Sequence, residues 1–336
     1  MQLGKFDLQK TVLIVAEIGN NHEGNFDVAK ELILKAKECS VDAVKFQTFK
    51  TEYFVSRRDP ARFDQLKSFE LSSSQFEQLS ELAHSLGLLF ISTPLDLESV
   101  AFLEPLVDCY KIASGDNTFY PLMKSICQTG KPIILSSGFS DLEQIKKSKQ
   151  FIEEQWKAKG FHQHLAVLHC VSSYPVPPNE VNLASIPFLA NTLNCDVGFS
   201  DHTIGIEASL IAVAVGARIL EKHFTLNKNY SHFRDHQLSA DPPEMKRLVQ
   251  EVGRVLTLLG KPEKVVQESE AKSSHLSRRS IVAAANLTQG HRLSWRDLTW
   301  MRPAVGMPPG NEERMVGKTL KRSLLLGEPI LFSDLE

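Results

Sequence analysis

The run that decides the fold is D-V-G-F-S-D-H-T-I-G-I-E-A-S-L-I-A-V-A-V-G-A-R-I-L-E-K-H-F-T, residues Asp196–Thr225. It predicts a short buried strand, an apolar helix and a second buried strand. Each strand ends in a polar cluster, Ser200-Asp201-His202 first and Glu221-Lys222-His223 second. In parallel α/β folds, ligands bind at the carboxyl ends of the strands. This stretch therefore predicts a parallel α/β fold in which adjacent strands deliver two imidazoles to one edge.

The same alternation of apolar, strand-like runs with helical patterns extends from the amino terminus to about residue 258. Stretches with apolar residues at helical spacing, such as Phe26–Cys39, separate the apolar runs. A doubly wound open sheet is the alternative to a barrel, but the first turn, Glu17–His22, lacks the glycine-rich fingerprint typical of that fold. Eight β/α units in about 250 residues favour a (β/α)8 TIM barrel. The predicted strands are Thr11–Ile18, Asp42–Thr48, Leu88–Pro94, Cys109–Ser114, Pro132–Gly138, Leu165–Val171, Asp196–Asp201 and Ala217–Thr225.

The composition and the hydrophobic pattern of the chain change after the predicted barrel. Gly260-Lys261-Pro262-Glu263 and the polar residues up to Ser274 are typical of a linker. Beyond it, short apolar pieces such as Ser280–Ala285 and Leu293–Trp300 are separated by Gly and Pro turns, which predicts a small β-rich module. We therefore predict a catalytic barrel over 1–258, a linker over 259–276 and a second domain over 277–336.

Composition limits the class of protein. A net charge of −2 over 336 residues gives no electrostatic case for binding nucleic acid or an anionic membrane. Five cysteines without a C-x-x-C pair favour a reducing compartment. The first ten residues lack the apolar core of a signal peptide, and the most apolar run, Ser209–Leu220, is too short to span a bilayer. We predict a cytoplasmic globular protein.

Two lysines on predicted strands point to an anion. Alternation places Lys45 and Gln47 on the same side of one strand, and Lys111 lies on another. Because lysine is almost never fully buried without a partner, both ammonium groups require a negative charge nearby. One interpretation is a phosphate or carboxylate ligand, with two Ser-Gly turns supplying hydroxyl and backbone N–H donors. The other is a set of internal ion pairs with Glu17 or Glu221.

The two histidines allow a metal ion. His202 and His223 would leave several coordination positions open, and two imidazoles with oxygen ligands suit Mn²⁺ or Mg²⁺ while also tolerating Co²⁺ or Zn²⁺. Such an ion would polarise a carbonyl group, and Glu17 is then the candidate for proton transfer or water activation. The alternatives are a pair of hydrogen-bonded histidines and a Glu17 that only neutralises a lysine.

Several motifs together resemble the sialic acid synthase family, and the tail from Ser277 to Glu336 resembles that family's antifreeze-like (SAF) domain. The likeness covers nearly the whole chain with the motifs in the family's order. The motifs are A-E-I-G-N-N-H-E-G (16–24), V-K-F-Q-T (44–48), Y-K-I-A-S-G (110–115), F-S-D-H-T (199–203) and E-K-H-F-T (221–225).

The resemblance implies condensation of phosphoenolpyruvate with an acylamino sugar such as N-acetylmannosamine, giving a nine-carbon 2-keto acid and phosphate. It implies that His202 and His223 hold the divalent ion and that Glu17 manages protons and water. It also implies that Arg302 reaches the sugar from the partner subunit of a domain-swapped homodimer. The implied phosphoenolpyruvate ligands are Lys45, Gln47, Thr93, Lys111, Ser114 and Ser136, and the implied sugar ligands are Asp116, Ser172, Tyr174, Asp235 and Arg302.

Three departures from the family pattern concern the sugar side. Phe233-Arg234-Asp235-His236 replaces the usual Gly-Pro-Asp-His, Ser172 replaces a common Asn, and Asp116 replaces a common Glu. We therefore expect that a precursor of legionaminic or pseudaminic acid can replace N-acetylmannosamine. Two alternatives remain: a phosphoenolpyruvate-dependent synthase of shorter keto acids, and a non-catalytic sugar-binding protein.

Overall fold

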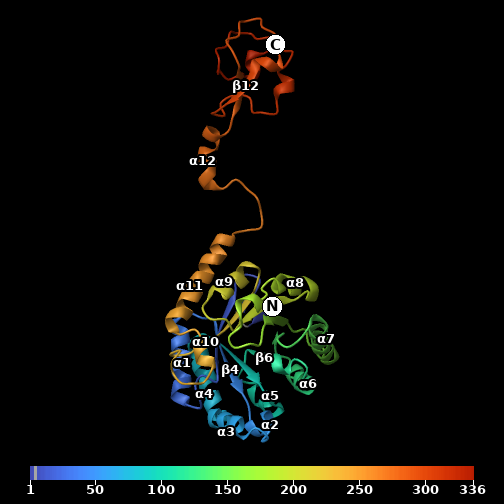
Figure 1. Ribbon diagram of the computed structural model, residues 1–336. Coiled ribbons are helices and arrows are strands. Elements are labelled where there is room, and N and C mark those ends of the chain that lie inside the picture. Colours follow the sequence, from blue (N-terminus) through green and yellow to red (C-terminus); the bar gives the residue numbers. More distant parts are fainter. Residues whose placement is uncertain (4–5) are drawn as a thin grey trace. The chain divides into compact units, whose positions relative to one another are not determined.

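The computed structural model describes residues 1–3 and 6–336 and divides into two compact units, Met1–Gly260 and Lys261–Glu336 (Figure 1). Each unit has its own hydrophobic core. The predicted linker, 259–276, contains all but the last residue of a helix, α12 (Glu268–Ser277), at whose start Glu270 accepts a hydrogen bond from the backbone N–H of Gln267 at 3.2 Å. This local cap lets a polar stretch form a helix without burying an apolar face.

The first unit is a closed barrel of eight parallel strands in the order β10-β3-β4-β5-β6-β7-β8-β9. Pairing of β10 with β3 closes the ring, which confirms the predicted (β/α)8 barrel and excludes the open sheet. The strands are β3 (Leu13–Gly19), β4 (Ala43–Thr48), β5 (Leu89–Pro94), β6 (Cys109–Ile112), β7 (Ile133–Ser136), β8 (Leu165–Cys170), β9 (Asp196–Asp201) and β10 (Ile219–His223).

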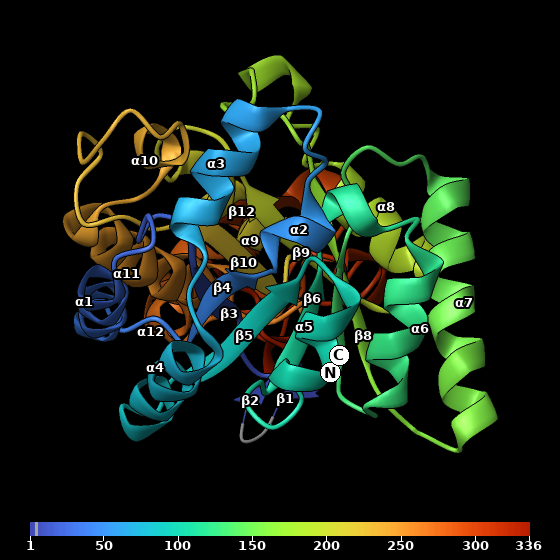
Figure 2. The same ribbon diagram turned by 90° about the horizontal axis from the view of Figure 1, so that it is seen from below.

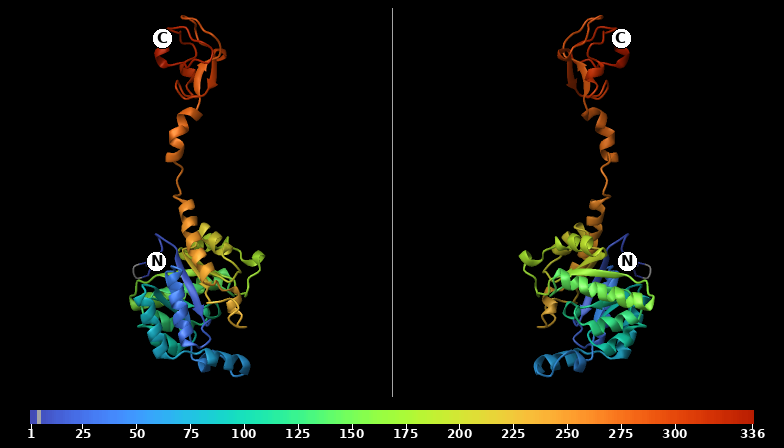
Figure 3. Two further views of the ribbon diagram at one scale, coloured as in Figure 1. Left: turned by 90° about the vertical axis from the view of Figure 1, so that its left-hand side faces the viewer. Right: turned by 90° about the vertical axis from the view of Figure 1, so that its right-hand side faces the viewer.

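The helices of the first unit lie outside these strands (Figures 1 and 3). Their starts are set by side-chain caps: Asn25 accepts from two backbone N–H groups of α1, and Asp141 and Asp241 each accept one at the starts of α7 and α11. The main helices are α1 (Phe26–Glu38), α4 (Ser73–Ser85), α5 (Leu97–Leu103), α6 (Tyr120–Gln128), α7 (Leu142–Lys159), α8 (Ser185–Leu193), α9 (Glu207–Ala214) and α11 (Pro242–Leu259).

The interior of the barrel is apolar at one end and charged at the other. Alternate strand residues point inward, and toward the amino ends of the strands these form one apolar cluster with Met1, Leu3 and Leu8 of the β1 (Gln2–Leu3) and β2 (Phe6–Asp7) region. The hairpin therefore closes that end. The inward apolar strand residues are Leu13, Val15, Ala43, Ile91, Cys109, Ile134, Ala166, Leu168 and Ile219.

Short extra elements follow the carboxyl ends of two strands. Helices α2 (Thr51–Phe54) and α3 (Pro60–Phe69) follow β4, and α10 (Asp235–Leu238) follows β10. Figure 2 shows them at one end of the barrel and the β1–β2 hairpin at the other. Two 3₁₀ turns, Ser114–Asp116 and Pro178–Glu180, complete this unit.

The second unit is small and rich in turns. Strands β11 (Ser280–Ala283) and β12 (Leu298–Met301) pair antiparallel and pack with apolar side chains such as Met315 and Leu320. The unit also contains 3₁₀ turns at Trp295–Asp297, Glu312–Arg314 and Phe332–Asp334. None of the helices in the described residues of either unit is both long and apolar enough to cross a membrane.

Candidate active site

A cavity of about 980 Å³ opens at the carboxyl ends of the barrel strands. It lies there because the inward-facing positions that carry apolar side chains deeper in the barrel carry polar ones at this end. Every residue that the sequence predicts for the site lines this cavity except Arg302. The predicted residues that line it are Glu17, Lys45, Gln47, Thr93, Lys111, Ser114, Asp116, Ser136, Ser172, Tyr174, His202, His223 and Asp235.

Four charged side chains form a buried network at the base of the cavity. The Lys45 ammonium lies 2.8 Å from Oε2 of Glu17 and 3.6 Å from Oε2 of Glu221, and the Lys111 ammonium lies 3.5 Å from Oε1 of Glu221. Ser200 donates a hydrogen bond to Glu221 at 2.9 Å. The predicted internal ion pairs are therefore present, and they line the same cavity that a ligand would enter.

The network sets the pKa values of its members. Burial raises the pKa of Glu17, and the neighbouring lysines only partly offset it. Burial would also raise the pKa of Glu221, but Lys111 and Lys45 outweigh it and bring that pKa to about 2. Burial lowers the pKa of Lys111, which has one carboxylate partner, whereas two carboxylates reverse the effect of burial and raise the pKa of Lys45. Glu17 is thus the carboxylate that takes up a proton most readily.

Hydroxyl groups line the same cavity as the two lysines. The Ser136 and Ser172 hydroxyl oxygens are buried and have no hydrogen-bond partner among the described residues. Ser114 Oγ accepts a hydrogen bond from the Gly138 N–H at 3.1 Å. A Cβ atom on Gly138 would lie only 2.2 Å from Ser172 Oγ and 2.6 Å from Ser114 Oγ, so glycine is required for this close approach. Thr93 completes the polar lining by accepting from Lys45 at 3.3 Å.

The two predicted histidines lie side by side at the cavity, with ring centroids 5.4 Å apart. Nδ1 of His202 lies 2.9 Å from the Val171 carbonyl oxygen, whereas Nδ1 of His223 is buried without a partner among the described residues. Burial, together with the charges of His202 and Lys45, lowers the pKa of His223 well below its usual value, so this imidazole is neutral and has a lone pair to offer.

These two imidazoles fit a divalent ion only if other oxygen ligands come from water or substrate. Within the described part of the chain, no group of three or more His, Cys, Asp and Glu side chains is arranged to hold a metal. Nδ1 of His223, without a partner among the described residues, and the neighbouring His202 ring are two imidazole donors that an open metal site can use.

The outer part of the cavity carries the residues predicted to contact the sugar. The Tyr174 ring lies 4.2 Å from the His202 ring, and the Arg234 guanidinium lies 4.6 Å from the centre of the Tyr174 ring. Arg234 Nε is 3.3 Å from Asp235 Oδ1. Burial raises the pKa of Asp116 to about 6 and also raises that of Asp235. The phenol of Tyr174 thus lies next to the imidazoles, and the protonatable carboxyl groups of Asp116 and Asp235 line the same cavity.

Some residues of this site are absent from the sequence-based prediction. One is Asn20, which donates a hydrogen bond to the predicted residue Gln47, and Gln47 in turn donates to Glu17. The Cys170 thiol lies 3.6 Å from Ser114 Oγ and 3.9 Å from His202 Nδ1. Asn20 adjoins Glu17 in a recognisable polar run, which could have marked it, whereas nothing in the apolar strand around Cys170 does. Arg302 lies in the second unit, at the exposed end of β12.

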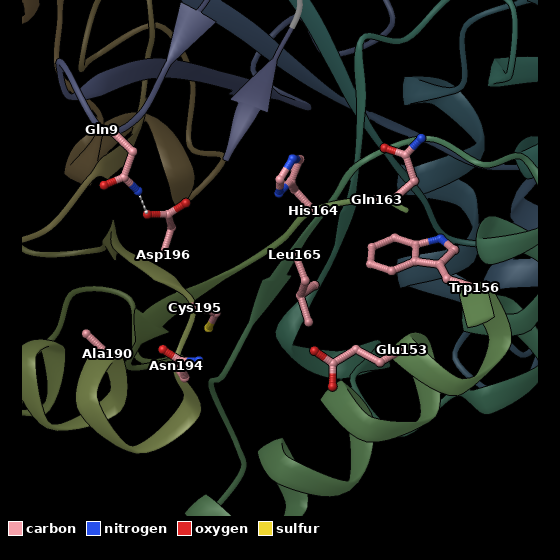
Figure 4. A pocket seen from close by; sticks show the side chains of 10 residues that line it. All are labelled: Gln9, Glu153, Trp156, Gln163, His164, Leu165, Ala190, Asn194, Cys195 and Asp196. Carbon is pink, nitrogen blue, oxygen red and sulfur yellow. Dashed lines mark hydrogen bonds between the residues drawn. The ribbon is translucent and has the colours of Figure 1, made fainter. Parts of the chain in front are cut away.

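A second cavity of about 450 Å³ lies at the amino ends of β8 and β9 (Figure 4). Glu153 and Trp156 of α7 line one side of it, and Cys195 lies on the other. Gln9 donates to Asp196 at 2.9 Å at its edge. Neither lysine nor arginine lines this cavity, so it lacks the cations that distinguish the larger one.

Residues 32–264 match the NeuB family, and residues 278–336 match the SAF domain. The chain is 37% identical over 340 residues to the N,N'-diacetyllegionaminic acid synthase of Legionella pneumophila, covering 97% of this chain and 95% of that protein. It is 32% identical over 325 residues to the N-acetylneuraminate-9-phosphate synthase of Homo sapiens, covering 92% and 89%.

A solved structure extends the likeness to the fold. The N-acetylneuraminic acid (sialic acid) synthetase of Leptospira borgpetersenii serovar Hardjo-bovis, in complex with citrate, has a TM-score of 0.75 and 31% identity to this chain. The match covers 81% of this chain and 94% of that one. The chain thus belongs to the NeuB family, the sialic acid synthases, and carries a C-terminal SAF domain.

Proposed function

We propose that this protein condenses phosphoenolpyruvate with an acylamino hexose, giving a nine-carbon 2-keto sugar acid of the sialic acid type and phosphate. The observation that supports this most is that two buried lysines, Lys45 and Lys111, and two imidazoles, His202 and His223, line one cavity. Relatives named as synthases of legionaminic acid and N-acetylneuraminate 9-phosphate support the same reaction class.

Phosphoenolpyruvate would bind at the base of the cavity. Lys45 and Lys111 supply the positive charge that a triply anionic substrate needs in a site away from water. The Ser136 hydroxyl, which has no partner among the described residues, and the Ser114 turn supply hydrogen-bonding groups in the same cavity. Thr93 and Gln47 complete the binding site at its edge.

A divalent ion, Mn²⁺ or Mg²⁺ with Co²⁺ or Zn²⁺ as substitutes, would be held by His202 and His223. The neutral His223 ring, whose Nδ1 has no partner in the part of the chain that the structure describes, supports that assignment. When bound, such an ion supplies Lewis acidity to the carbonyl oxygen of the acceptor sugar.

In the reaction, C3 of phosphoenolpyruvate forms a bond to the aldehyde carbon of the sugar while C2 acquires positive charge. Water adds to C2, and the resulting tetrahedral intermediate loses phosphate by cleavage of the C2–O bond. Glu17 borders the base of the cavity with a raised pKa, which suits a group that takes a proton from the attacking water and returns it. Lys45 and Lys111 hold the departing phosphate and the carboxylate.

The acceptor would lie in the outer part of the cavity, against Asp116, Ser172, Tyr174 and Asp235. N-acetylmannosamine and the acylamino sugars that lead to legionaminic or pseudaminic acid all belong to the proposed substrate class. We further infer that the enzyme is a homodimer in which Arg302 of one subunit contacts the sugar bound by the other.

The test is to incubate the purified protein with phosphoenolpyruvate, a divalent ion and a panel of acylamino sugars. We expect phosphate release that depends on the sugar and a 2-keto acid of matching mass. Phosphate release without a keto acid of matching mass would exclude the proposed condensation. Neither product with any sugar would leave a sugar-binding protein.

A further inference from the structure

One wall of the outer cavity is used by none of the roles assigned above. It consists of Arg62, Gln65 and Leu66 on α3 and Phe233 and Arg234 on the loop after β10, and we call it the α3 wall. Gln65 and Leu66 lie three and four positions after Arg62, so all three residues share one helix face. That face lines the cavity.

The α3 wall is fixed in place by packing. Leu66 and Phe69 of α3 belong to a small apolar cluster with Phe49 and Leu95, separate from the main barrel core, and Phe233 packs against it. The Phe69 and Phe233 rings meet edge to face with centroids 5.2 Å apart. The two segments of the wall are therefore held against each other by the protein's own packing, which suits a surface that selects between ligands.

The end of α3 is also held by polar contacts. Glu70 accepts hydrogen bonds from the Thr51 N–H at 3.1 Å and from the Lys50 ammonium at 3.0 Å. Burial would raise the pKa of Glu70, but these donors and Lys67 bring it to about 2. Glu70 thus remains charged and ties α3 to the start of α2.

The chemistry of the wall alternates donors with apolar groups. Arg62 and Gln65 are exposed donors, and no Asp or Glu oxygen in the described chain lies within 4.0 Å of Arg62. Leu66 and Phe233 supply apolar surface between them. An acylamino group needs this combination, because its carbonyl oxygen accepts hydrogen bonds and its methyl group packs against apolar surface.

The wall connects to the reacting end of the acceptor. Arg234 covers the Tyr174 ring, and that ring in turn packs against His202. A sugar whose aldehyde lies at the two imidazoles and whose body lies along Tyr174 would therefore present its far end to the α3 wall.

The charges of the outer cavity oppose a phosphate on the acceptor. Two guanidinium groups, those of Arg62 and Arg234, and three carboxyl groups, those of Asp59, Asp116 and Asp235, line this cavity. Arg234 already lies 3.3 Å from Asp235. When its carboxyl groups are ionised, this half of the cavity carries no excess positive charge, so a doubly charged phosphate gains little there.

On the basis of the proposed function, we propose that the natural acceptor carries a second acylamino group, at the end remote from the aldehyde, and no phosphate. Arg62 and Gln65 would donate to the carbonyl oxygen of that group, and Leu66 and Phe233 would contact its methyl group. Arg62 and Gln65 are thus specificity-determining residues.

The experiment compares kcat/KM for three acceptors at saturating phosphoenolpyruvate: N-acetylmannosamine, N-acetylmannosamine 6-phosphate and a 2,4-diacetamido hexose. We expect the diacetamido sugar to be the best substrate and the phosphorylated sugar the worst. In Gln65→Ala and in Arg62→Ala, the ratio of kcat/KM for the diacetamido sugar to that for N-acetylmannosamine should fall about tenfold each, the effect of losing one hydrogen bond to substrate.

Arg58→Ala is the matched control, because Arg58 is exposed on the same segment and does not line the cavity. It should leave the ratio unchanged. A preference for the phosphorylated sugar that Arg62→Ala abolishes would overturn the proposal and make Arg62 a phosphate ligand. Equal use of the two unphosphorylated sugars would overturn it as well. Failure of all three acceptors to yield a keto acid would instead overturn the proposed function, and the role of the α3 wall with it.

Discussion

The Lys45 ammonium lies 2.8 Å from the Glu17 carboxylate, and each side chain is no more than 4% exposed. With Glu221 and Lys111, this pair makes the base of the cavity internally neutral before any substrate enters. To form ion pairs with Lys45 and Lys111, a triply anionic substrate must therefore replace the carboxylates of Glu17 and Glu221, which already pair with them. Glu17, whose pKa burial raises, is the partner that gives way most easily.

Glu17→Gln should separate binding from chemistry. Removing the charge frees Lys45 for phosphoenolpyruvate, so the Kd for phosphoenolpyruvate should fall or stay unchanged. Turnover should fall by roughly 10²- to 10⁴-fold, because the group that moves the proton is gone. Calorimetric titration with phosphoenolpyruvate and steady-state phosphate release check the two effects. A variant with normal kcat would show that Glu17 only neutralises Lys45.

Glu221→Gln should lower the stability of the fold, and bound phosphoenolpyruvate should restore part of that stability. Lys45 would then keep only Glu17 and Lys111 would lose its carboxylate partner, and breaking a buried ion pair costs about 3–5 kcal/mol of unfolding free energy. Phosphoenolpyruvate should raise the stability of this variant more than that of the wild type, as measured by urea unfolding with and without the ligand. Ser200→Ala is the control, since it removes only a hydrogen bond to Glu221, worth about 1 kcal/mol. Equal stabilisation of both proteins would contradict a shared anion site.

His223→Ala should abolish turnover that depends on a divalent ion and leave the fold intact. Nδ1 of His223 has no hydrogen-bond partner among the described residues. Removing it therefore leaves no other buried group without its hydrogen bond. Manganese binding followed by paramagnetic resonance, together with thermal unfolding, distinguishes loss of the ion from loss of structure. Full activity in this variant would refute the ligand assignment.

Arg302→Ala should raise the KM for the sugar more than that for phosphoenolpyruvate. If Arg302 acts in the partner's site, co-expression with Lys45→Ala should restore about a quarter of wild-type activity, because half of randomly paired dimers contain one intact site of two. The two variants expressed separately are the controls. Mixed dimers without recovered activity would place Arg302 in its own subunit's site, and an Arg302→Ala protein that is fully active by itself would place it outside both.

His22 predicts a specific pH dependence of stability. Burial lowers its pKa from 6.5 to about 4 in the folded state, and its Nδ1 accepts a hydrogen bond from the Gly24 N–H at 3.0 Å. Below pH 6.5 His22 binds a proton in the unfolded chain but stays neutral in the folded protein. The free energy of unfolding therefore falls as the pH falls from 6.5 to about 4. The full loss is about 3 kcal/mol.

His22→Asn keeps an acceptor for Gly24 and cannot be protonated. The difference in unfolding free energy between wild type and variant, measured in urea at several pH values, should therefore shift in favour of the variant as the pH falls through this window. A difference independent of pH would mean that His22 is protonated in the folded state.

The sequence by itself determined the barrel and the identity of most of its site. Eight apolar runs of strand length fix the fold, and the two-residue period of a strand places Glu17, Lys45 and Glu221 in line with inward apolar residues such as Val15 and Ala43. The predicted strand Asp196–Asp201 has the same bounds as β9, because turn residues and a polar cluster mark both of its ends.

Only the tertiary structure decided which charges meet and which further surfaces join the site. Glu221 bridges Lys45 and Lys111 across non-neighbouring strands, a contact that exists only because the ring closes. From the sequence alone, Arg62 and Gln65 would be placed on the polar face of an exposed helix. They line the cavity because Phe69 and Phe233, remote in the chain, pack together and turn that face inward. Periodicity records the direction of a side chain relative to its own element, and long-range packing decides what that side chain faces.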